Sequence, residues 1–295
     1  MQKPNLLLGL GAALAVICIW SGFIVFSRAG VTTGLTAYDI SALRFAVAGA
    51  LVLPFAFAWW PRHLSIWSLI AIMICGPGAT YSILVYLGLT NASAAYAGVF
   101  ANGSLPIFTA ILTFVLARDL PGRGQVAAIA FIILGGVFVG YRGMTSGGAD
   151  VLSGIGLFLA ASAVLSFYIY GVRYWALTPK QALVAVNIPN AALFLPIWYF
   201  FLPSGMAEAE TSMILFQAAF QGLGPGFLAL ILFSVAAYHL GPTPTAGFSA
   251  VVPASAALLA IPVLSEVPTP MEWAGIAIVT LGLALLMVAA RKSPE

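Results

Sequence analysis

Arg44 is the one formal charge that falls well inside an apolar segment of this sequence, within ISALRFAVAGALVLP at residues 40–54. An arginine costs roughly 2.5–3.5 kcal/mol at the centre of a membrane helix, so its presence there needs an explanation. A guanidinium that faces a cavity can hold a carboxylate through two parallel hydrogen bonds. The structural alternative is that Arg44 extends to the interface or holds carbonyls of an interrupted helix, and both readings stay open.

Several polar and aromatic side chains in other apolar segments are candidates to line a binding cavity with Arg44. They are Trp20, Ser21, Tyr81, Ser82, Asn102, Ser166, Tyr170 and Asn187. Aromatic rings suit the apolar part of a small substrate, and hydroxyl and amide groups can direct its amino and carboxyl groups. Two alternatives remain, because aromatic residues also gather at membrane interfaces, and amides such as Asn187 and Asn190 often bond neighbouring helices.

The sequence lacks the patterns of catalysis and of metal binding. H-E-x-x-H and G-x-S-x-G are absent, and Cys18 and Cys75 both lie within apolar runs. Intramembrane chemistry needs a convergent nucleophile, base or metal, so we predict neither an enzyme nor a cofactor, metal ion or disulfide. A membrane-embedded enzyme or a sensor is the less favoured alternative, and a channel would favour a ring of pore residues.

The composition indicates that lipid surrounds most of the chain. Of 295 residues, 62% are hydrophobic and only 6% are charged, and the mean hydropathy is +1.08. A soluble domain carries about 25% charged residues, so this chain could not cover a surface that faces water. The apolar runs are continuous rather than alternating, which favours helices over a membrane barrel. The net charge of +3 forms no basic patch of the kind that binds nucleic acid.

Turn and charge signals divide the chain into ten segments of membrane-spanning length, since a bilayer needs about 20 apolar residues per helix. The predicted spans are 6–27, 37–58, 66–88, 92–116, 124–141, 151–174, 181–202, 212–237, 245–264 and 272–290. The first is a helix rather than a signal peptide, because its apolar run is too long. The stretch YRGMTSGGAD, residues 141–150, is a predicted joint.

Lysine and arginine favour one side of this arrangement. That side carries Lys3, Arg62, Arg118, Arg123, Arg173, Lys180, Arg291 and Lys292, against Arg28 and Arg142 on the other. The positive-inside rule therefore predicts that both termini are cytoplasmic.

The two halves of the chain resemble each other. Residues 8–28 align without a gap with residues 153–173, and ARDLP at 117–121 corresponds to LSEVP at 264–268. Each half holds five predicted helices, and an odd number inverts the second half relative to the first. The sequence thus predicts an all-α membrane protein with two inverted repeats, residues 1–145 and 146–295, which is typical of secondary transporters.

Glycine and proline occupy matching places in the two repeats. The residues predicted to interrupt or bend the helices are Gly76, Pro77, Gly78, Gly98 and Pro106, with Gly224, Pro225, Gly226, Gly247 and Pro253. Interrupted helices expose backbone groups, which are tolerated where a cavity or neighbouring protein receives them. We predict that the two Gly-Pro-Gly triplets flank a substrate path and that the two prolines at 106 and 253 allow gating. Alternatively, the triplets only let helices pack closely.

The chain resembles the EamA-type ten-helix exporters of the drug/metabolite transporter superfamily. The resemblance rests on Trp20-Ser21, Arg44-Phe45, Pro106, and the acidic residues Asp119 and Glu266 before a Leu/Val-Pro turn. Family members usually carry Glu at the first of these acidic places, so Asp119 departs from the pattern. The resemblance covers essentially the whole chain. It implies a transporter of the bacterial inner membrane that exports small metabolites, commonly amino acids.

The aromatic content resembles the aromatic amino-acid exporters of this group, which implies aromatic and other neutral amino acids as substrates. A multidrug or cationic-compound exporter of the same superfamily is the alternative. No Asp or Glu lies deep in a predicted span, so we expect downhill or weakly coupled movement rather than a carboxylate proton relay. Small-residue rows at 135–140 and 275–282 are predicted to be scaffold or a homodimer contact, and a monomer is equally compatible with the sequence.

Overall fold

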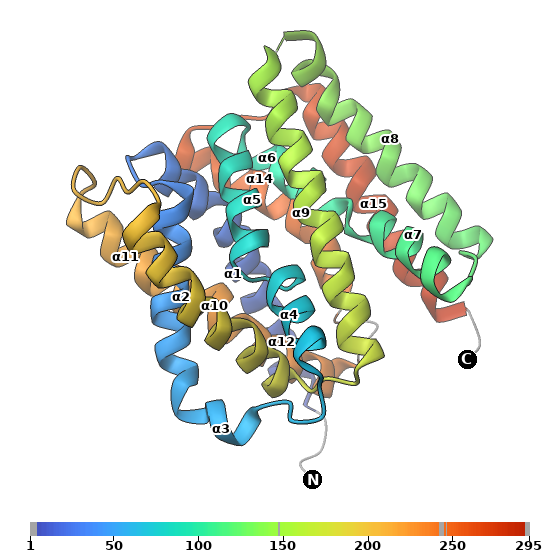
Figure 1. Cartoon of the computed structure of the whole chain (residues 1–295). Helices are drawn as coiled ribbons and strands as arrows, with labels where there is room; N and C mark the ends of the chain where they lie inside the picture. Colours follow the sequence, from blue (N-terminus) through green and yellow to red (C-terminus); the bar gives the residue numbers. More distant parts are fainter. Residues whose placement is uncertain (1–4, 147, 242–244, 246, 293–295) are drawn as a thin grey trace.

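A computed structural model describes residues 5–146, 148–241, 245 and 247–292. Within these residues the chain forms helices and short connections, with no strand (Figure 1). Nine helical segments in the described part are long and apolar enough to cross a membrane, and a tenth, Ser249–Leu264, is apolar but shorter. The prediction of an all-helical membrane protein with about ten apolar helices is confirmed.

The helical elements follow one another with few residues between them. In chain order they are α1 (Leu6–Thr32), α2 (Ala37–Val52), η1 (Leu53–Phe55), α3 (Ala56–Trp59), α4 (Ile66–Cys75), α5 (Ala79–Asn91), α6 (Ala94–Ala97), η2 (Gly98–Gly103), α7 (Leu105–Ala117), α8 (Arg123–Ser146), α9 (Gly148–Tyr174), α10 (Pro179–Phe201), α11 (Thr211–Leu223), η3 (Gly224–Leu228), α12 (Ala229–Leu240), η4 (Ser249–Val251), α14 (Val252–Leu264) and α15 (Pro270–Lys292).

Polar residues cap the starts of several of these helices. The Asn5 side chain accepts hydrogen bonds from the backbone at the start of α1, and Ser65 does the same for α4. Thr36 and Thr178 each form a capping box, with Asp39 and Gln181 respectively. Such caps satisfy N–H groups that the helix leaves unpaired, which fixes where each helix enters its apolar stretch.

One predicted joint is shorter than expected. The stretch 141–150 was expected to be a loop, but α8 continues to Ser146 and α9 begins at Gly148. Gly148 has a φ of +68°, a conformation that glycine adopts without the steric cost of a Cβ atom. The two helices therefore follow each other through a very tight turn.

The two Gly-Pro-Gly triplets differ from each other, which corrects the prediction of paired breaks. At the first triplet α4 ends at Cys75 and α5 begins at Ala79, so the helix is interrupted. At the second triplet α11 passes into the π-helical turn η3 and then into α12, and the whole segment Thr211–Leu240 stays helical. Only the first triplet therefore breaks its helix.

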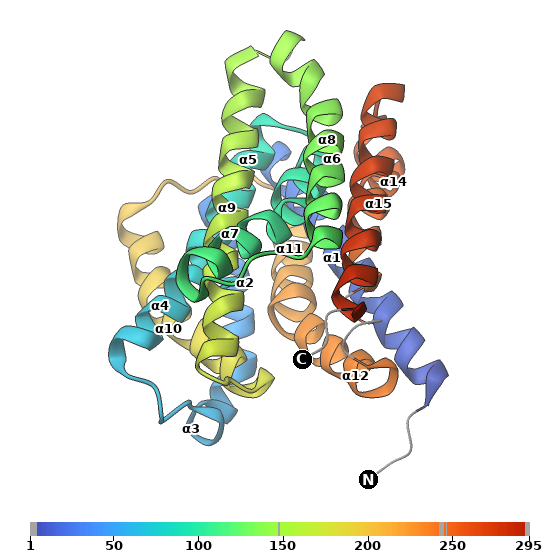
Figure 2. The ribbon, with the colours of Figure 1, turned by 90° about the vertical axis from the view of Figure 1, so that its right-hand side faces the viewer.

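The helices that carry the small-residue rows, α8 and α15, lie side by side at one edge of the bundle (Figures 1 and 2). A Cβ atom on Gly135 would lie 2.6 Å from the Gly275 carbonyl oxygen, and a Cβ on Gly275 would lie 2.6 Å from the Gly135 carbonyl oxygen. The small residues thus allow these two helices of the same chain to approach closely. A homodimer through α8 and α15 stays a prediction and would have to use their other faces.

Two elements at corresponding sequence positions share their local structure. Both α7 and α14 are 13 residues long and have a proline, Pro106 or Pro253, in their first turn. Each is preceded by an irregular turn, η2 or η4, and each ends at a residue with left-handed backbone, Arg118 or Ser265. A Cβ atom on Gly98 would lie 3.1 Å from the Pro253 Cα atom, so the two segments meet near their bends.

Candidate functional site

Arg44 lies inside the bundle and not at its surface. Its side chain is only 4% exposed, and its Nη2 donates a hydrogen bond of 3.1 Å to the carbonyl oxygen of Pro77 in the first triplet. The guanidinium carbon lies 5.5 Å from the ring centroid of Phe23 and 5.8 Å from that of Phe45, within cation–π range. The Nε atom is buried and has no hydrogen-bond partner among the described residues. Arg44 therefore stabilises the broken helix and keeps one donor unused.

Aromatic and hydroxyl side chains surround this guanidinium. The Phe23 ring stacks on Tyr81 with centroids 6.3 Å apart, and its centroid lies 5.7 Å from that of Tyr86. Ser82 is fully buried, and its hydroxyl has no hydrogen-bond partner in the described part of the chain. We call Phe23, Arg44, Tyr81, Ser82 and Tyr86 the central cluster. It contains three of the residues that the sequence singled out, Arg44, Tyr81 and Ser82.

A buried glutamine pair extends the central cluster and was missed from the sequence. The Tyr86 hydroxyl donates to Gln221 Oε1 at 3.3 Å, and Gln221 Nε2 donates to Ser27 Oγ at 2.9 Å and to Gln217 Oε1 at 3.1 Å. Gln217 Nε2 in turn donates to the Phe26 carbonyl oxygen at 2.6 Å. Both glutamines are fully buried. Their spacing of four residues within an apolar run was the available signal, because it puts both on one helix face.

The intramembrane asparagines bond the irregular backbone of the triplets. Asn190 accepts from the Ala79 N–H at 2.8 Å and donates to the Met73 carbonyl oxygen at 3.2 Å, so it bridges the ends of α4 and α5. Asn187 donates to the Gly226 carbonyl oxygen at 3.3 Å in the second triplet. The geometry favours the interhelical alternative for these amides over direct substrate contact.

The remaining candidates lie outside the central cluster. The Trp20 ring centroid lies 5.7 Å from that of Phe233, and the Ser21 hydroxyl lies 2.8 Å from the Ser255 hydroxyl. Ser166 Oγ donates to the Ala163 carbonyl oxygen at 2.6 Å, and Tyr170 stacks on Tyr174 with centroids 6.0 Å apart. Asn102 is half-buried in the π-helical turn η2.

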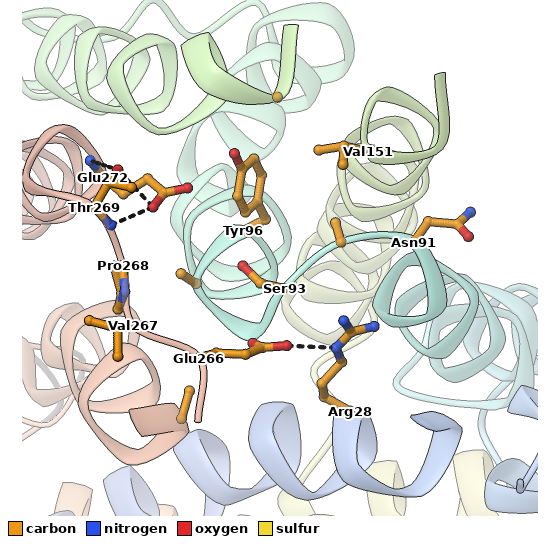
Figure 3. A pocket seen from close by; sticks show the side chains of 14 residues that line it. Arg28, Asn91, Ser93, Tyr96, Val151, Glu266, Val267, Pro268, Thr269 and Glu272 are labelled. Carbon is orange, nitrogen blue, oxygen red and sulfur yellow. Dashed lines mark hydrogen bonds and ion pairs between the residues drawn. The ribbon is translucent and has the colours of Figure 1, made fainter. Parts of the chain in front are cut away.

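A cavity of about 440 Å³ opens at the end of the bundle that carries Arg28 and Glu266, here called the Arg28 end (Figure 3). It is lined by Arg28, Asn91, Ala92, Ser93, Ala95, Tyr96, Gly143, Val151, Ala260, Glu266, Val267, Pro268, Thr269 and Glu272. Arg28 Nε lies 2.9 Å from Glu266 Oε1, and Arg28 also donates to the Leu89 carbonyl oxygen. Glu266 Oε2 accepts from the Ala94 N–H at 2.9 Å, which caps α6. The ion pair therefore joins α1, α5 and α6 to the connection before α15.

The apolar helices and the buried polar cluster between them define a multi-pass membrane protein. Comparison with known proteins gives its class: residues 7–141 match the EamA-like transporter family. The N-terminal half of the chain is thus similar to the EamA-like transporter family, in agreement with the resemblance found in the sequence. A relative from Bacillus subtilis (strain 168), "Uncharacterized transporter YwfM", is 26% identical over 274 residues, which cover 87% of this chain and 86% of the relative.

A solved structure described as "Crystal structure of protein" shares the fold. Its TM-score to this chain is 0.66 at 18% identity, and the match covers 96% of this chain and 98% of that one. The family and the relative indicate a membrane transporter rather than an enzyme.

Proposed function

We propose that this protein exports amino acids, with aromatic and other neutral ones as the main substrates, across the bacterial inner membrane. The observation that supports this most is the unused Nε donor of a buried Arg44 beside the rings of Phe23 and Tyr81. A carboxylate would satisfy the guanidinium charge, and an aromatic side chain would pack on the rings. The family match supports transport in general, and the substrate is inferred from this chemistry.

Transport would proceed by alternating access between two inverted halves, residues 1–145 and 146–295. The shared local structure of α7 and α14 supports the repeat, since both begin with a proline and end at a left-handed residue. Bends at these prolines and at Gly98 and Gly247 would let one end open while the other closes.

The charged residues at the two ends differ in a way that suits such a cycle. Arg28 and Glu266 form an ion pair at one end. The residues that align with them, Arg173 and Asp119, are exposed and form no ion pair among the described residues. Alternating access requires the two ends to be in different states at any one time, so this asymmetry supports the proposal. The positive-inside rule would place the Arg28 end outside the cell.

Arg44 has two duties in this proposal, and a set of variants separates them. Arg44→Gln keeps an N–H donor at this position but removes the charge, whereas Arg44→Ala removes both. We expect Arg44→Gln to lower kcat/KM for L-phenylalanine in proteoliposomes by about 10- to 100-fold, because a charge-assisted contact is lost. Arg44→Ala should in addition lower the thermal stability.

The matched substrate L-phenylalaninol, which lacks the carboxylate, provides the control. Its transport should be equally slow with the wild type and with Arg44→Gln. If the wild type moves L-phenylalaninol as well as L-phenylalanine, or moves cationic drugs but no amino acid, the proposed substrate class is wrong. Uphill accumulation driven by an imposed pH gradient would contradict the expected downhill or weakly coupled movement.

A further inference from the structure

Among the described residues that line the cavity at the Arg28 end, three carry a charge, and two of these three neutralise each other. Arg28 and Glu266 are paired at 2.9 Å, and the second oxygen of Glu266 accepts the Ala94 N–H. Glu272 also lines the cavity and is 8% exposed. The described lining residues therefore leave an excess negative charge at Glu272, which favours a positively charged group in the cavity.

One oxygen of Glu272 has a structural duty and the other does not. Oε2 accepts hydrogen bonds from the Thr269 N–H at 2.6 Å and from the Thr269 hydroxyl at 2.9 Å, which caps the start of α15. Oε1 accepts no hydrogen bond from the described residues and points across the cavity in the direction of Tyr96 (Figure 3). The charge of Glu272 is thus directed into the cavity.

Two other caps in this chain show that the capping duty does not require this charge. At α10 the neutral Gln181 accepts the N–H and the hydroxyl of Thr178, both at 3.0 Å. At α2 the residue is a carboxylate, Asp39, but its second oxygen accepts the Trp198 indole N–H at 2.9 Å. In the first cap no charge is present, and in the second the protein itself uses the additional oxygen. At Glu272 that oxygen faces an open cavity instead.

We propose that this cavity binds a small molecule with a protonated primary amine, and that Glu272 Oε1 accepts a hydrogen bond from the ammonium group. A volume of about 440 Å³ accommodates a molecule of amino-acid size. Asn91 and Ser93 add polar side chains to the lining, and Val151, Val267 and other apolar residues supply a hydrophobic surface. A carboxylate that meets an ammonium group in a partly enclosed site forms a strong, charge-assisted hydrogen bond.

This inference rests on the proposed function and extends it. An exporter must release its substrate at the Arg28 end if that end faces outward. An amino acid that leaves the central cluster would then lose the contact of its carboxylate with Arg44 and gain a contact of its ammonium group with Glu272. The two sites would recognise opposite ends of the same zwitterion.

The test uses Glu272→Gln, which keeps the cap in the way that Gln181 does but removes the charge. Binding of L-phenylalaninamide to the full-length protein in detergent is measured by isothermal titration calorimetry. We expect binding to weaken by about 10- to 100-fold, the loss that removal of a hydrogen bond to a charged group predicts. N-acetyl-L-phenylalaninamide, which lacks the ammonium group, should bind the wild type and the variant equally weakly. The control Gln181→Glu adds a carboxylate to a cap elsewhere and should leave binding unchanged.

A thiol introduced by Ser93→Cys, in a background with Cys18→Ser and Cys75→Ser, locates the bound amine. L-phenylalaninamide should slow the reaction of this thiol with a water-soluble thiol reagent, and Glu272→Gln should abolish the protection. Equal affinity for L-phenylalaninamide with and without the Glu272 charge, or no protection of the thiol at saturation, would overturn the proposal.

Proteoliposome transport separates this site from the proposed function. In one outcome the wild type exports L-phenylalanine, and Glu272→Gln binds L-phenylalaninamide and exports L-phenylalanine as well as the wild type does. The amine site is then wrong and the proposed function stands. If the wild type moves no amino acid but binds L-phenylalaninamide in a manner that depends on Glu272, the proposed function is wrong and the amine site stands.

Discussion

The two Gly-Pro-Gly triplets have the same three residues and different structures. At the first, Gly76 has an extended backbone with ψ of 179°, and the helix stops. At the second, Gly224 has ψ of −90°, and the chain continues through a π-helical turn. Both glycines avoid the helical conformation, as expected for a residue before proline. The local sequence therefore disrupts a regular α-helix at both places but does not determine how far the disruption goes.

The neighbours of each triplet account for the difference. At the first triplet Arg44 donates to the Pro77 carbonyl oxygen, and Asn190 bonds both the Met73 carbonyl oxygen and the Ala79 N–H. These side chains satisfy the polar groups that an interrupted helix leaves unpaired. At the second triplet, Asn187 donates to the Gly226 carbonyl oxygen. A full break in an apolar environment needs several polar partners, because each unpaired backbone group is costly there.

The largest expected effect on stability comes from the asparagines. Asn190→Leu would leave the Ala79 N–H without its partner and remove donors from the Met73 and Val186 carbonyl oxygens. We expect a loss of about 3 kcal/mol, since each buried polar group left unpaired costs about 1–3 kcal/mol. Asn187→Leu should cost less, about 1–2 kcal/mol, because it removes only donors to carbonyl oxygens. Unfolding in mixed micelles of a mild detergent and SDS measures the stability of both variants. Equal losses of stability would contradict the conclusion that the first triplet depends more on its polar partners than the second.

Replacing the first glycine of each triplet with alanine should give a smaller difference in stability, again with the larger loss at the first triplet. A Cβ atom on Gly76 would lie 2.5 Å from the Ile72 carbonyl oxygen, whereas a Cβ on Gly224 would come no closer than 3.5 Å to its neighbour, a side-chain carbon of Ile19. Gly76→Ala should therefore destabilise the protein by about 1–3 kcal/mol through overpacking. Gly224→Ala should change the stability by less than about 0.5 kcal/mol. The same unfolding assay measures both variants. A loss of stability from Gly224→Ala as large as that from Gly76→Ala would show that the second triplet is also tightly constrained.

The sequence predicts the helices well because lipid imposes a simple requirement. A span needs a long apolar run with its backbone bonded internally, and both features are visible in composition and spacing. The joint at 141–150 is shorter than the sequence predicts. Polar residues such as Thr145 and Ser146 indicate a loop, but a tight turn at Gly148 lets the helices extend past the apolar runs.

The candidate site was harder to predict because it depends on partners that are distant along the chain. The sequence left open whether Arg44 faces a cavity, extends to the interface or holds carbonyls of an interrupted helix, and its contact with the Pro77 carbonyl oxygen follows from the packing of α2 against the broken helix. The glutamine pair at 217 and 221 was overlooked because its partners Tyr86, Ser27 and Phe26 are distant along the chain. Arg28 follows the first predicted span and Glu266 follows the ninth, so the predicted topology puts both on the same side of the membrane, yet their pairing follows from tertiary structure.

The smallest effect on stability is expected from the prolines, and it tests how the second triplet is built. Pro225→Ala restores a backbone N–H within a segment that is helical on both sides. We expect the π-helical turn to become regular α-helix, with a stability change within about 1 kcal/mol and greater protection of the amides of η3 from hydrogen exchange.

Pro77→Ala should leave the first break unchanged, because Arg44 and Asn190 already occupy the polar groups that a continuous helix would pair internally. Hydrogen exchange followed by mass spectrometry compares the two variants directly. If Pro77→Ala instead joined α4 to α5 into one protected helix, the proline and not its polar neighbours would be the cause of the break. The transport rate of Pro225→Ala then shows whether the π-helical turn bends during the cycle, since a regularised helix would slow that step and leave substrate affinity unchanged.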